Sequence, residues 1–171
     1  MRNYFLTTER LGFGLWSIND FDLAKSLWGN ANVTKHIGGV YSDEKVTARL
    51  TKEIASYQNH RVQYWPIFDL VTNEFVGCCG LCVYDKEKGI YELGFHLKEK
   101  FWGKGLAYEA ATAALEYGKM QLKIIQYFAG HNPHNIASKG LLLKLGFEYS
   151  HDEYYEGTGL QHPSYMKIIK N

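Results

Sequence analysis

A short glycine-containing turn is the part of this sequence best suited to chemistry. The turn reads Lys100-Phe101-Trp102-Gly103-Lys104-Gly105, and it separates an alternating apolar segment, 90–97, from an alanine-rich segment, 107–117. A helix that begins directly after a strand leaves its first N–H groups unpaired, and its dipole adds about half a positive charge there. The two glycines let an anion approach and allow the positive φ angles that a nest of amides needs. The turn therefore predicts a phosphate site formed by the amides of residues 101–106, with a plain connecting turn as the alternative.

Two other phosphate-binding loops are excluded by single residues. A P-loop requires Ser or Thr after its Gly-Lys pair, but Gly103-Lys104 is followed by Gly105. A dinucleotide fingerprint requires a third glycine where Tyr108 stands, and an acidic residue about twenty positions on, where the sequence reads Ile-Ile-Gln-Tyr. Neither nucleotide-binding motif accounts for this turn.

The turn resembles a third pattern, Q/R-x-x-G-x-G/A, which is the acyl-coenzyme A pyrophosphate loop of the GNAT superfamily of N-acetyltransferases. Lys100 departs from the pattern at its first position. The residues that follow, with those at 8–11, 36–39, 135–138 and 144–147, are similar to the RimJ/RimL-like branch, which acetylates N-termini of ribosomal proteins. Gly14 stands where that branch usually has arginine. The resemblance covers nearly the whole chain.

The resemblance implies both a fold and a reaction. The fold is an α/β (α+β) domain with a mixed, mostly antiparallel central sheet of about seven strands, helices on both faces, and a splayed parallel strand pair that holds acyl-CoA. The reaction is transfer of an acetyl group from acetyl-CoA to a primary amine, a protein N-terminus or a small molecule, by direct attack in a ternary complex. The alternative is a non-catalytic acyl-CoA-binding or interaction domain that has kept the fold.

The coenzyme is expected along the strand 91–97 and over the turn. Gly94 would permit a bulge where this strand parts from its parallel neighbour, and an exposed N–H near Gly94 would donate to the thioester oxygen. Lys104 adds a charge for a phosphate. The residues expected to bind acetyl-CoA are Phe95, Leu97, Phe101, Trp102, Gly103, Lys104, Gly105, Leu106, Ala107, Asn135 and Ser138.

A base must remove a proton from the incoming amine. Glu92 is the first candidate, since it shares a strand face with Gly94 and His96; the alternative is that it faces solvent or pairs with a lysine. His96 is the second candidate. Leu142 stands where many family members place a tyrosine acid, so Ser138 is the nearest hydroxyl to the leaving sulfur. Helix capping alone would also account for Asn135 and Ser138.

The cysteines at 78, 79 and 82 do not predict a metal site. Residues three apart on a strand, such as Cys79 and Cys82, point to opposite faces and cannot share an ion. The seven histidines are scattered along the chain, so we expect no metal. Acetyl-CoA as the cosubstrate is what the resemblance implies.

The composition predicts one domain, 1–171, with 46% apolar residues to form a single core. The 19 basic and 18 acidic residues nearly balance, which argues against a nucleic-acid or membrane partner. No apolar run is long enough to span a bilayer, so we expect a cytoplasmic monomer or homodimer. Its partners are then acetyl-CoA and an amine acceptor.

The pattern of apolar residues predicts the elements that position this site. Helices are expected after Asn19-Asp20, over 43–57, over 107–118, where Gly118 ends the helix, and over 135–145. Strands are expected at 11–15, 62–71, 74–84, 90–97 and 123–129, with a closing antiparallel hairpin of 147–154 and 164–169. The strand, helix, strand order across 90–129 predicts a parallel pair.

Overall fold

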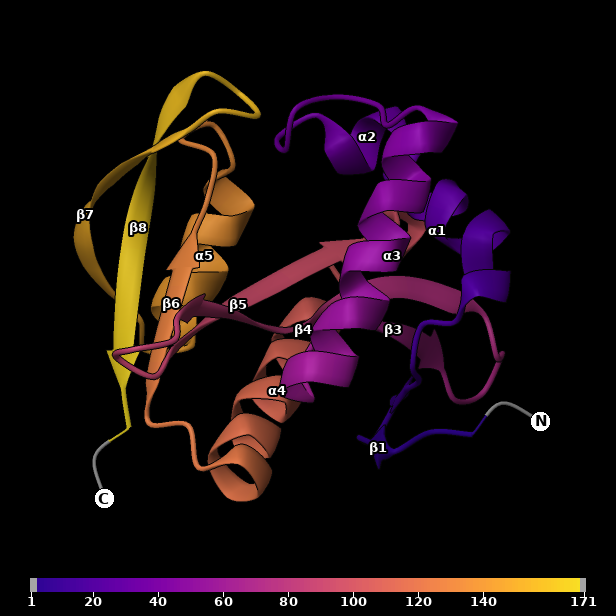
Figure 1. Ribbon diagram of the computed structural model, residues 1–171, viewed down its shortest axis with the longest axis horizontal. Helices are drawn as coiled ribbons and strands as arrows, with labels where there is room; N and C mark the ends of the chain where they lie inside the picture. The colour runs from indigo at the N-terminus through magenta and orange to yellow at the C-terminus, as the bar shows by residue number, and fades with distance from the viewer. Residues whose placement is uncertain (1–2, 170–171) are drawn as a thin grey trace.

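The computed structural model describes residues 3–169, which contain one mixed sheet with strand order β1-β2-β3-β4-β5-β6-β8-β7 (Figure 1). All neighbours pair antiparallel except β5 and β6, as predicted. The sheet has eight strands rather than about seven, because a two-residue strand is too short for alternation to reveal. The strands are β1 (Leu6–Thr7), β2 (Leu11–Phe13), β3 (Tyr64–Asp69), β4 (Phe75–Asp85), β5 (Ile90–Leu97), β6 (Gln126–Gly130), β7 (Glu148–Tyr155) and β8 (Leu160–Ile168).

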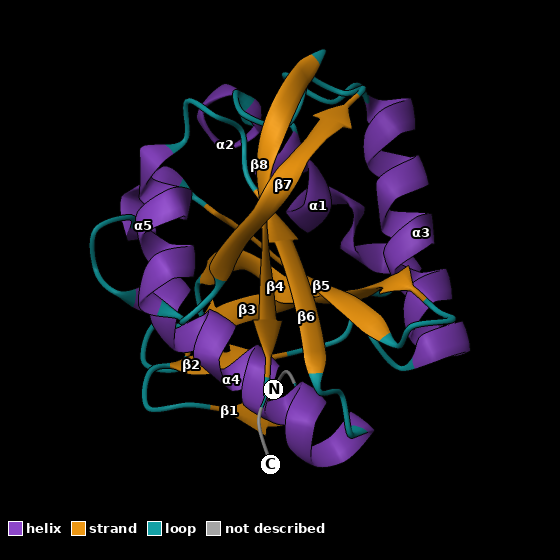
Figure 2. Cartoon of the chain, turned by 90° about the vertical axis from the view of Figure 1, so that its left-hand side faces the viewer, coloured by secondary structure: helices purple, strands orange, loops and turns teal. Residues whose placement is uncertain are grey.

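Helices cover both faces of the sheet, as predicted. Figure 2 shows α4 and α5 on one side of the strands and α3 on the other. Two short 3-10 turns, Ile18–Asp20 and Glu99–Phe101, precede α1 and the glycine turn. The helices are α1 (Phe21–Trp28), α2 (Ala31–Thr34), α3 (Asp43–His60), α4 (Leu106–Leu122) and α5 (Ile136–Lys144).

The alternation of side chains along β4 and β5 divides the core in two. Cys79 and Leu93 face α4 and belong to one apolar cluster, whereas Cys78 belongs to the second cluster, under α1 and α3. Cys82 packs against that second cluster. Cys79 and Cys82 therefore lie on opposite faces, as the spacing predicted, and Glu92 and His96 lie on the α3 face with Cys82.

The parallel pair is short, and its two strands then separate. The β5–β6 ladder runs from Ile90↔Gln126 to Glu92↔Phe128 and stops there, although β5 continues to Leu97. On its other side, β6 pairs with β8 along its whole length, from Gln126 to Gly130. Within residues 3–169, the β6-facing edge of β5 has no strand partner after Glu92. This is the splayed pair that the resemblance implied.

Two expectations about glycines are wrong. The β4–β5 register passes through Gly94 without a bulge, and Gly94 instead makes room for the ring of Tyr64, which a Cβ would strike. Gly118 does not end its helix, because α4 continues to Leu122. A Cβ on Gly118 would lie 2.7 Å from the Tyr127 hydroxyl oxygen, so this glycine permits close helix–sheet packing.

Two loops meet at one end of the molecule. In Figure 1 the tip of the β7–β8 hairpin reaches toward the loop that follows α2. The backbones touch there, since a Cβ on Gly38 would lie 2.6 Å from the carbonyl oxygen of Gly157.

None of the helices in the described part of the chain combines the length and apolarity that crossing a bilayer requires.

Candidate active site

The glycine turn has the backbone geometry that the sequence predicted. Gly103 and Gly105 have φ angles of 71° and 77°, and Gly105 is the N-cap residue of α4. A Cβ on Gly103 would meet no atom within 4 Å, so the space above the turn is open and a side chain would stand in it. Trp102 anchors the turn, because its Nε1–H donates to the Leu97 carbonyl oxygen at 2.7 Å.

A cluster of polar side chains supports the turn from the N-terminal segment. Glu109 accepts hydrogen bonds from the Thr8 hydroxyl at 2.5 Å and from Arg10 Nε at 2.6 Å. Arg10 Nη1 also donates to the Lys104 carbonyl oxygen at 2.9 Å. Burial opposes ionisation of Glu109, but these hydrogen bonds outweigh it and lower the pKa of its carboxyl group. Glu109 therefore holds two chain segments together.

The two lysines of the turn point away from its open side. Lys100 Nζ pairs with Glu74 Oε1 at 2.6 Å, which explains a lysine at the first position of the loop pattern. The Lys104 side chain lies over the Phe101 ring, with Nζ 5.7 Å from the ring centroid. Lys104 contributes its carbonyl to the Arg10 contact rather than a charge to the space above the glycines.

A cavity of about 500 Å³, here called the turn cavity, opens above the glycine turn between β5 and α5. Lys35 and Lys144, which sequence reasoning missed, also line it and supply positive charge. The resemblance includes Lys144 within 144–147 but assigns it no ligand role, and nothing in the sequence marks Lys35. Every residue predicted to bind the coenzyme except Lys104 lines this cavity: Phe95, Leu97, Phe101, Trp102, Gly103, Gly105, Leu106, Ala107, Asn135 and Ser138.

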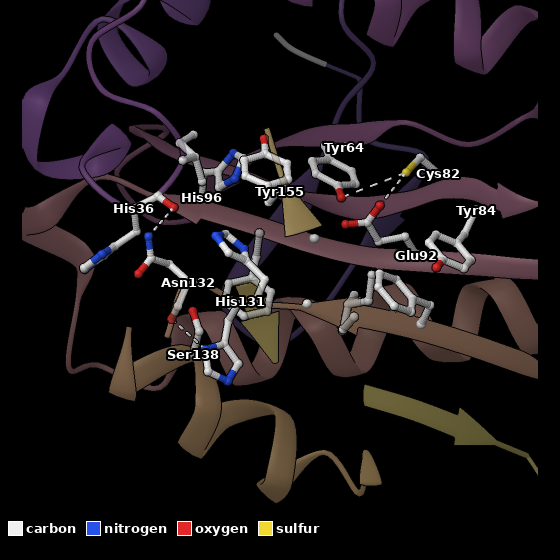
Figure 3. Close-up of a pocket in the computed structure, with 18 of the residues that line it drawn as sticks. His36, Tyr64, Cys82, Tyr84, Glu92, His96, His131, Asn132, Ser138 and Tyr155 are labelled. Atoms are coloured by element: carbon white, nitrogen blue, oxygen red, sulfur yellow. Dashed lines mark hydrogen bonds between the residues drawn. The ribbon is translucent and has the colours of Figure 1, made fainter. Parts of the chain in front are cut away.

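A second cavity, of about 320 Å³ and here called the Glu92 cavity, lies on the α3 face of β5. Figure 3 shows Tyr64 and Cys82 beside Glu92 in this cavity. Cys82 Sγ lies 3.5 Å from Glu92 Oε2, and the Tyr64 hydroxyl lies 4.0 Å from the same sulfur. Burial raises the pKa of Glu92, against the opposing effect of these neighbours. Burial also raises the pKa of Cys82, which is therefore a neutral thiol that donates to the carboxylate.

His96 is held in one protonation state. Trp28 Nε1–H donates to His96 Nδ1 at 3.2 Å, so the neutral ring carries its proton on Nε2. Burial, helped by the positive charge of Arg49, lowers the pKa of His96 to about 3. The imidazole is therefore uncharged at neutral pH, and its Nδ1 lone pair is already occupied.

The two cavities meet where β5 has parted from β6. The residues that line both are His36, Ile37, Phe95, His96, Asn135 and Ser138. Asn135 caps α5, since its side-chain oxygen accepts from the Ser138 N–H at 3.1 Å. The capping interpretation of Asn135 is confirmed, and Ser138 lines both cavities. Leu142 is buried beside this junction and offers no hydroxyl.

The comparisons with known proteins agree with this geometry. Residues 10–148 match the acetyltransferase (GNAT) domain. That span is most of the chain, so the chain belongs to the GNAT family of acetyltransferases, which use acetyl-CoA. The uncharacterized N-acetyltransferase p20 of Bacillus licheniformis is 30% identical over 145 residues, which cover 84% of this chain and 82% of that protein.

Ribosomal-protein acetyltransferases are also among the similar proteins. The [ribosomal protein uS5]-alanine N-acetyltransferase of Escherichia coli K12 is 35% identical over 88 residues, covering 50% of this chain and 44% of that one. The solved structure of RimL, the ribosomal L7/L12 alpha-N-protein acetyltransferase, in complex with coenzyme A has a TM-score of 0.82. It is 18% identical and covers 98% of each chain, a likeness that shows a shared fold. The resemblance to RimJ/RimL-like enzymes is confirmed.

Proposed function

We propose that this protein is an acetyl-CoA-dependent N-acetyltransferase that acts on a primary amine within a ternary complex. One observation carries the proposal: the turn cavity and the Glu92 cavity meet along Phe95 and His96, where β5 has a free backbone edge. Acetyl-CoA occupies the turn cavity and the amine enters the Glu92 cavity. The two substrates then reach each other without leaving the protein.

The glycine turn holds the pyrophosphate of the coenzyme. Its N–H groups and the N-terminus of α4 provide donors and positive potential, and Lys35 and Lys144 add charge at the cavity wall. The free edge of β5 binds the pantetheine arm by backbone hydrogen bonds. A β5 N–H beyond Glu92 donates to the thioester oxygen as negative charge develops on it.

Glu92 accepts the proton of the amine, directly or through one water molecule. Burial raises its pKa, which makes it a better base than an ordinary carboxylate. His96 ranks below it, because protonation of Nδ1 would break the bond from Trp28 and a pKa of about 3 makes a weak base. The neutral His96 ring instead forms part of the wall between the substrates.

Ser138 supplies the hydroxyl at the junction, where it hydrogen-bonds the leaving sulfur. A thiol with a pKa near 8.5 leaves readily as its thiolate. The hydrogen bond from Ser138 therefore assists the departure of the sulfur, and the sulfur need not be protonated in the same step.

The proposal is tested by measuring free thiol released from acetyl-CoA with a panel of amines and short peptides. Release above the rate without amine supports it. Tight acetyl-CoA binding with no release on a broad panel would contradict it and favour a non-catalytic acyl-CoA-binding domain.

A further inference from the structure

A largely buried arginine faces the same cavity as Glu92 and has no part in the steps above. Arg49 lies on α3, and its guanidinium carbon is 5.0 Å from the ring centroid of Trp28 and 5.0 Å from that of Tyr64. Its Nε–H donates to Glu53 Oε1 at 2.7 Å, while Glu53 Oε2 accepts from the backbone N–H of Tyr64 at 2.7 Å. Two rings and one carboxylate thus fix the guanidinium in place.

The remaining donors of Arg49 are unused. A guanidinium carries five N–H donors, and Glu53 accepts from one of them. In the described range, 3–169, neither terminal amino group of Arg49 has a hydrogen-bond acceptor. Only 20% of this side chain is exposed, and it lines the Glu92 cavity. These terminal amino groups are not among the fully buried, unpaired polar atoms of the described residues, so they are open to the cavity and suited to an acceptor that arrives there.

Charges of opposite sign stand on opposite walls of this cavity. Lys52 lies one helical turn beyond Arg49 and lines the same cavity, as does Glu53, the partner of Arg49. With two cations and one anion, the α3 wall keeps a net positive charge. Glu92 stands on β5 across from them. The charge of Arg49 is near enough to oppose the burial-driven rise in the pKa of Glu92. A molecule with an amine at one end and an anion at the other would complement both walls.

The small volume of the cavity favours a small occupant. Its volume of about 320 Å³ is at the lower end of small-molecule sites, which span roughly 300–1,000 Å³. The loop after α2 and the β7–β8 tip contribute Ile37 and Tyr155 to the lining, and these two loops touch at Gly38 and Gly157. A chain entering from that end would have to part them.

We propose that the amine acceptor is a free amino acid, a small molecule that carries a carboxylate together with its amine. Arg49 binds the carboxylate with its two terminal amino groups, and Glu92 faces the amine. This inference rests on the proposed function and names the acceptor class for that site. The amine nitrogen forms a bond to the thioester carbon, the C–S bond breaks, Glu92 takes the amine proton, and the sulfur leaves as thiolate. The product is an N-acetyl amino acid.

Matched acceptors test the role of the carboxylate. Thiol release is measured with free amino acids, with their amides, and with the amines that lack the carboxylate, and short peptides complete the panel. We expect kcat/KM for the acid to exceed that for its amide by about tenfold or more, because a charge-assisted pair is lost in the amide. A series of ω-amino acids of increasing length then measures the span between Arg49 and Glu92.

Variants at position 49 test whether Arg49 binds the carboxylate of the acceptor. The readout is the ratio of kcat/KM for acid and amide, which does not depend on the fraction of protein that is folded. Arg49→Met should bring the ratio to about 1. Arg49→Lys keeps the positive charge but lacks the two terminal amino groups of the planar guanidinium, so it should give an intermediate value. Lys45→Met is the control, since Lys45 lies on α3 over Tyr41 and outside the cavity lining. Its ratio should equal that of the wild type.

The outcomes separate this inference from the proposed function. Equal activity on acids and amides, or better activity on peptides than on free amino acids, overturns the inference and leaves acetyl transfer standing. If Arg49→Met does not fold, the wild-type panel and Arg49→Lys still decide. Absence of thiol release with every amine would overturn both.

Discussion

The ring of Tyr64 occupies the space that a side chain on Gly94 would fill. Tyr64 comes from β3 and Gly94 from β5, with β4 between them, and the hydroxyl of Tyr64 reaches the thiol of Cys82 beside Glu92. The missing Cβ at position 94 therefore sets where the tyrosine stands, and the tyrosine in turn forms part of the surroundings of the carboxylate.

Gly94→Ala should both destabilise the protein and impair its reaction. The new methyl group would displace the Tyr64 ring from a packed position, which costs about 1–3 kcal/mol in a well-packed core. Denaturant unfolding measures the stability, and thiol release measures kcat. Gly140→Ala is the control, because a Cβ there meets no atom within 4 Å and Gly140 lies within α5. A Gly94→Ala protein with unaltered stability and kcat would refute this account of the contact.

Gly105→Ala should weaken acetyl-CoA binding. The residue has φ of 77° and lines the turn cavity, so a methyl group there strains the backbone that presents the amides of the turn. We expect the Kd from calorimetric titration to rise about tenfold or more, which corresponds to about 1.4 kcal/mol.

Gly89→Ala separates strain from binding. Gly89 also has a positive φ, 65°, and open space around it, but it lies in the β4–β5 turn and outside the cavity lining. Both variants should lose similar stability, about 1–2 kcal/mol, while only Gly105→Ala changes the Kd. Equal affinity in the wild type and Gly105→Ala would argue against the phosphate site.

Glu92→Gln should remove the base. Proton transfer by a positioned side chain contributes roughly 10²- to 10⁴-fold, so kcat should fall within that range while acetyl-CoA affinity stays nearly constant. The wild-type rate should decline as pH falls through the pKa of Glu92, because the protonated carboxyl cannot accept a proton. Burial raises that pKa, so the decline should lie above the ordinary glutamate range, and the Gln variant should lack it.

Glu153→Gln is the matched control for this measurement. Glu153 lines the same cavity and accepts a hydrogen bond from the Tyr84 hydroxyl at 2.7 Å, but its side chain is 45% exposed. The rate of Glu153→Gln at neutral pH, and the decline of that rate as pH falls, should resemble those of the wild type. If the decline in rate at low pH disappears in Glu153→Gln and persists in Glu92→Gln, the base has been misassigned.

Glu109→Gln should loosen the glycine turn without touching the reaction centre. The substitution weakens the contact with Arg10, which in turn holds the Lys104 carbonyl. We expect KM for acetyl-CoA to rise about two- to fivefold with kcat unchanged, since partly exposed ion pairs contribute about 1 kcal/mol or less. Steady-state kinetics measures KM for acetyl-CoA and kcat. The control is Lys25→Gln, which breaks the exposed Lys25–Asp43 pair and should leave both constants unchanged. A fall in kcat would mean that Glu109 acts on the chemistry.

The sequence was sufficient for the features that depend on local pattern. The glycine turn was predictable because Gly103 and Gly105 are separated by one residue between a strand pattern and a helix pattern. The parallel pair followed from the strand, helix, strand order, and the facing of Cys79 and Cys82 followed from the two-residue period of a strand. In each case the physical rule acts over a few neighbouring residues.

Features that depend on which elements meet could not be predicted. A glycine within a strand, such as Gly94, indicates a position that permits a bulge, because nothing local says that a tyrosine thirty residues earlier will lie over it. Gly118 was interpreted as a helix end for the same reason, since its partner is Tyr127 across the core. Helical spacing alone places Arg49 on the charged, solvated side of the helix 43–57, and only its packing between Trp28 and Tyr64 places it in the cavity. Long-range contacts override such local signals.

The short β5–β6 ladder leaves an open strand edge in the middle of a sheet rather than at its border. Such edges ordinarily template pairing with another polypeptide, and proteins protect them. Here the gap lies between β5 and β6, which stay paired with β4 and β8, so under the proposed function a slender molecule with its own amide groups occupies it. The same hydrogen-bonding groups that would make a border strand prone to aggregation are thus kept for a ligand, and the fold protects itself by where the gap lies.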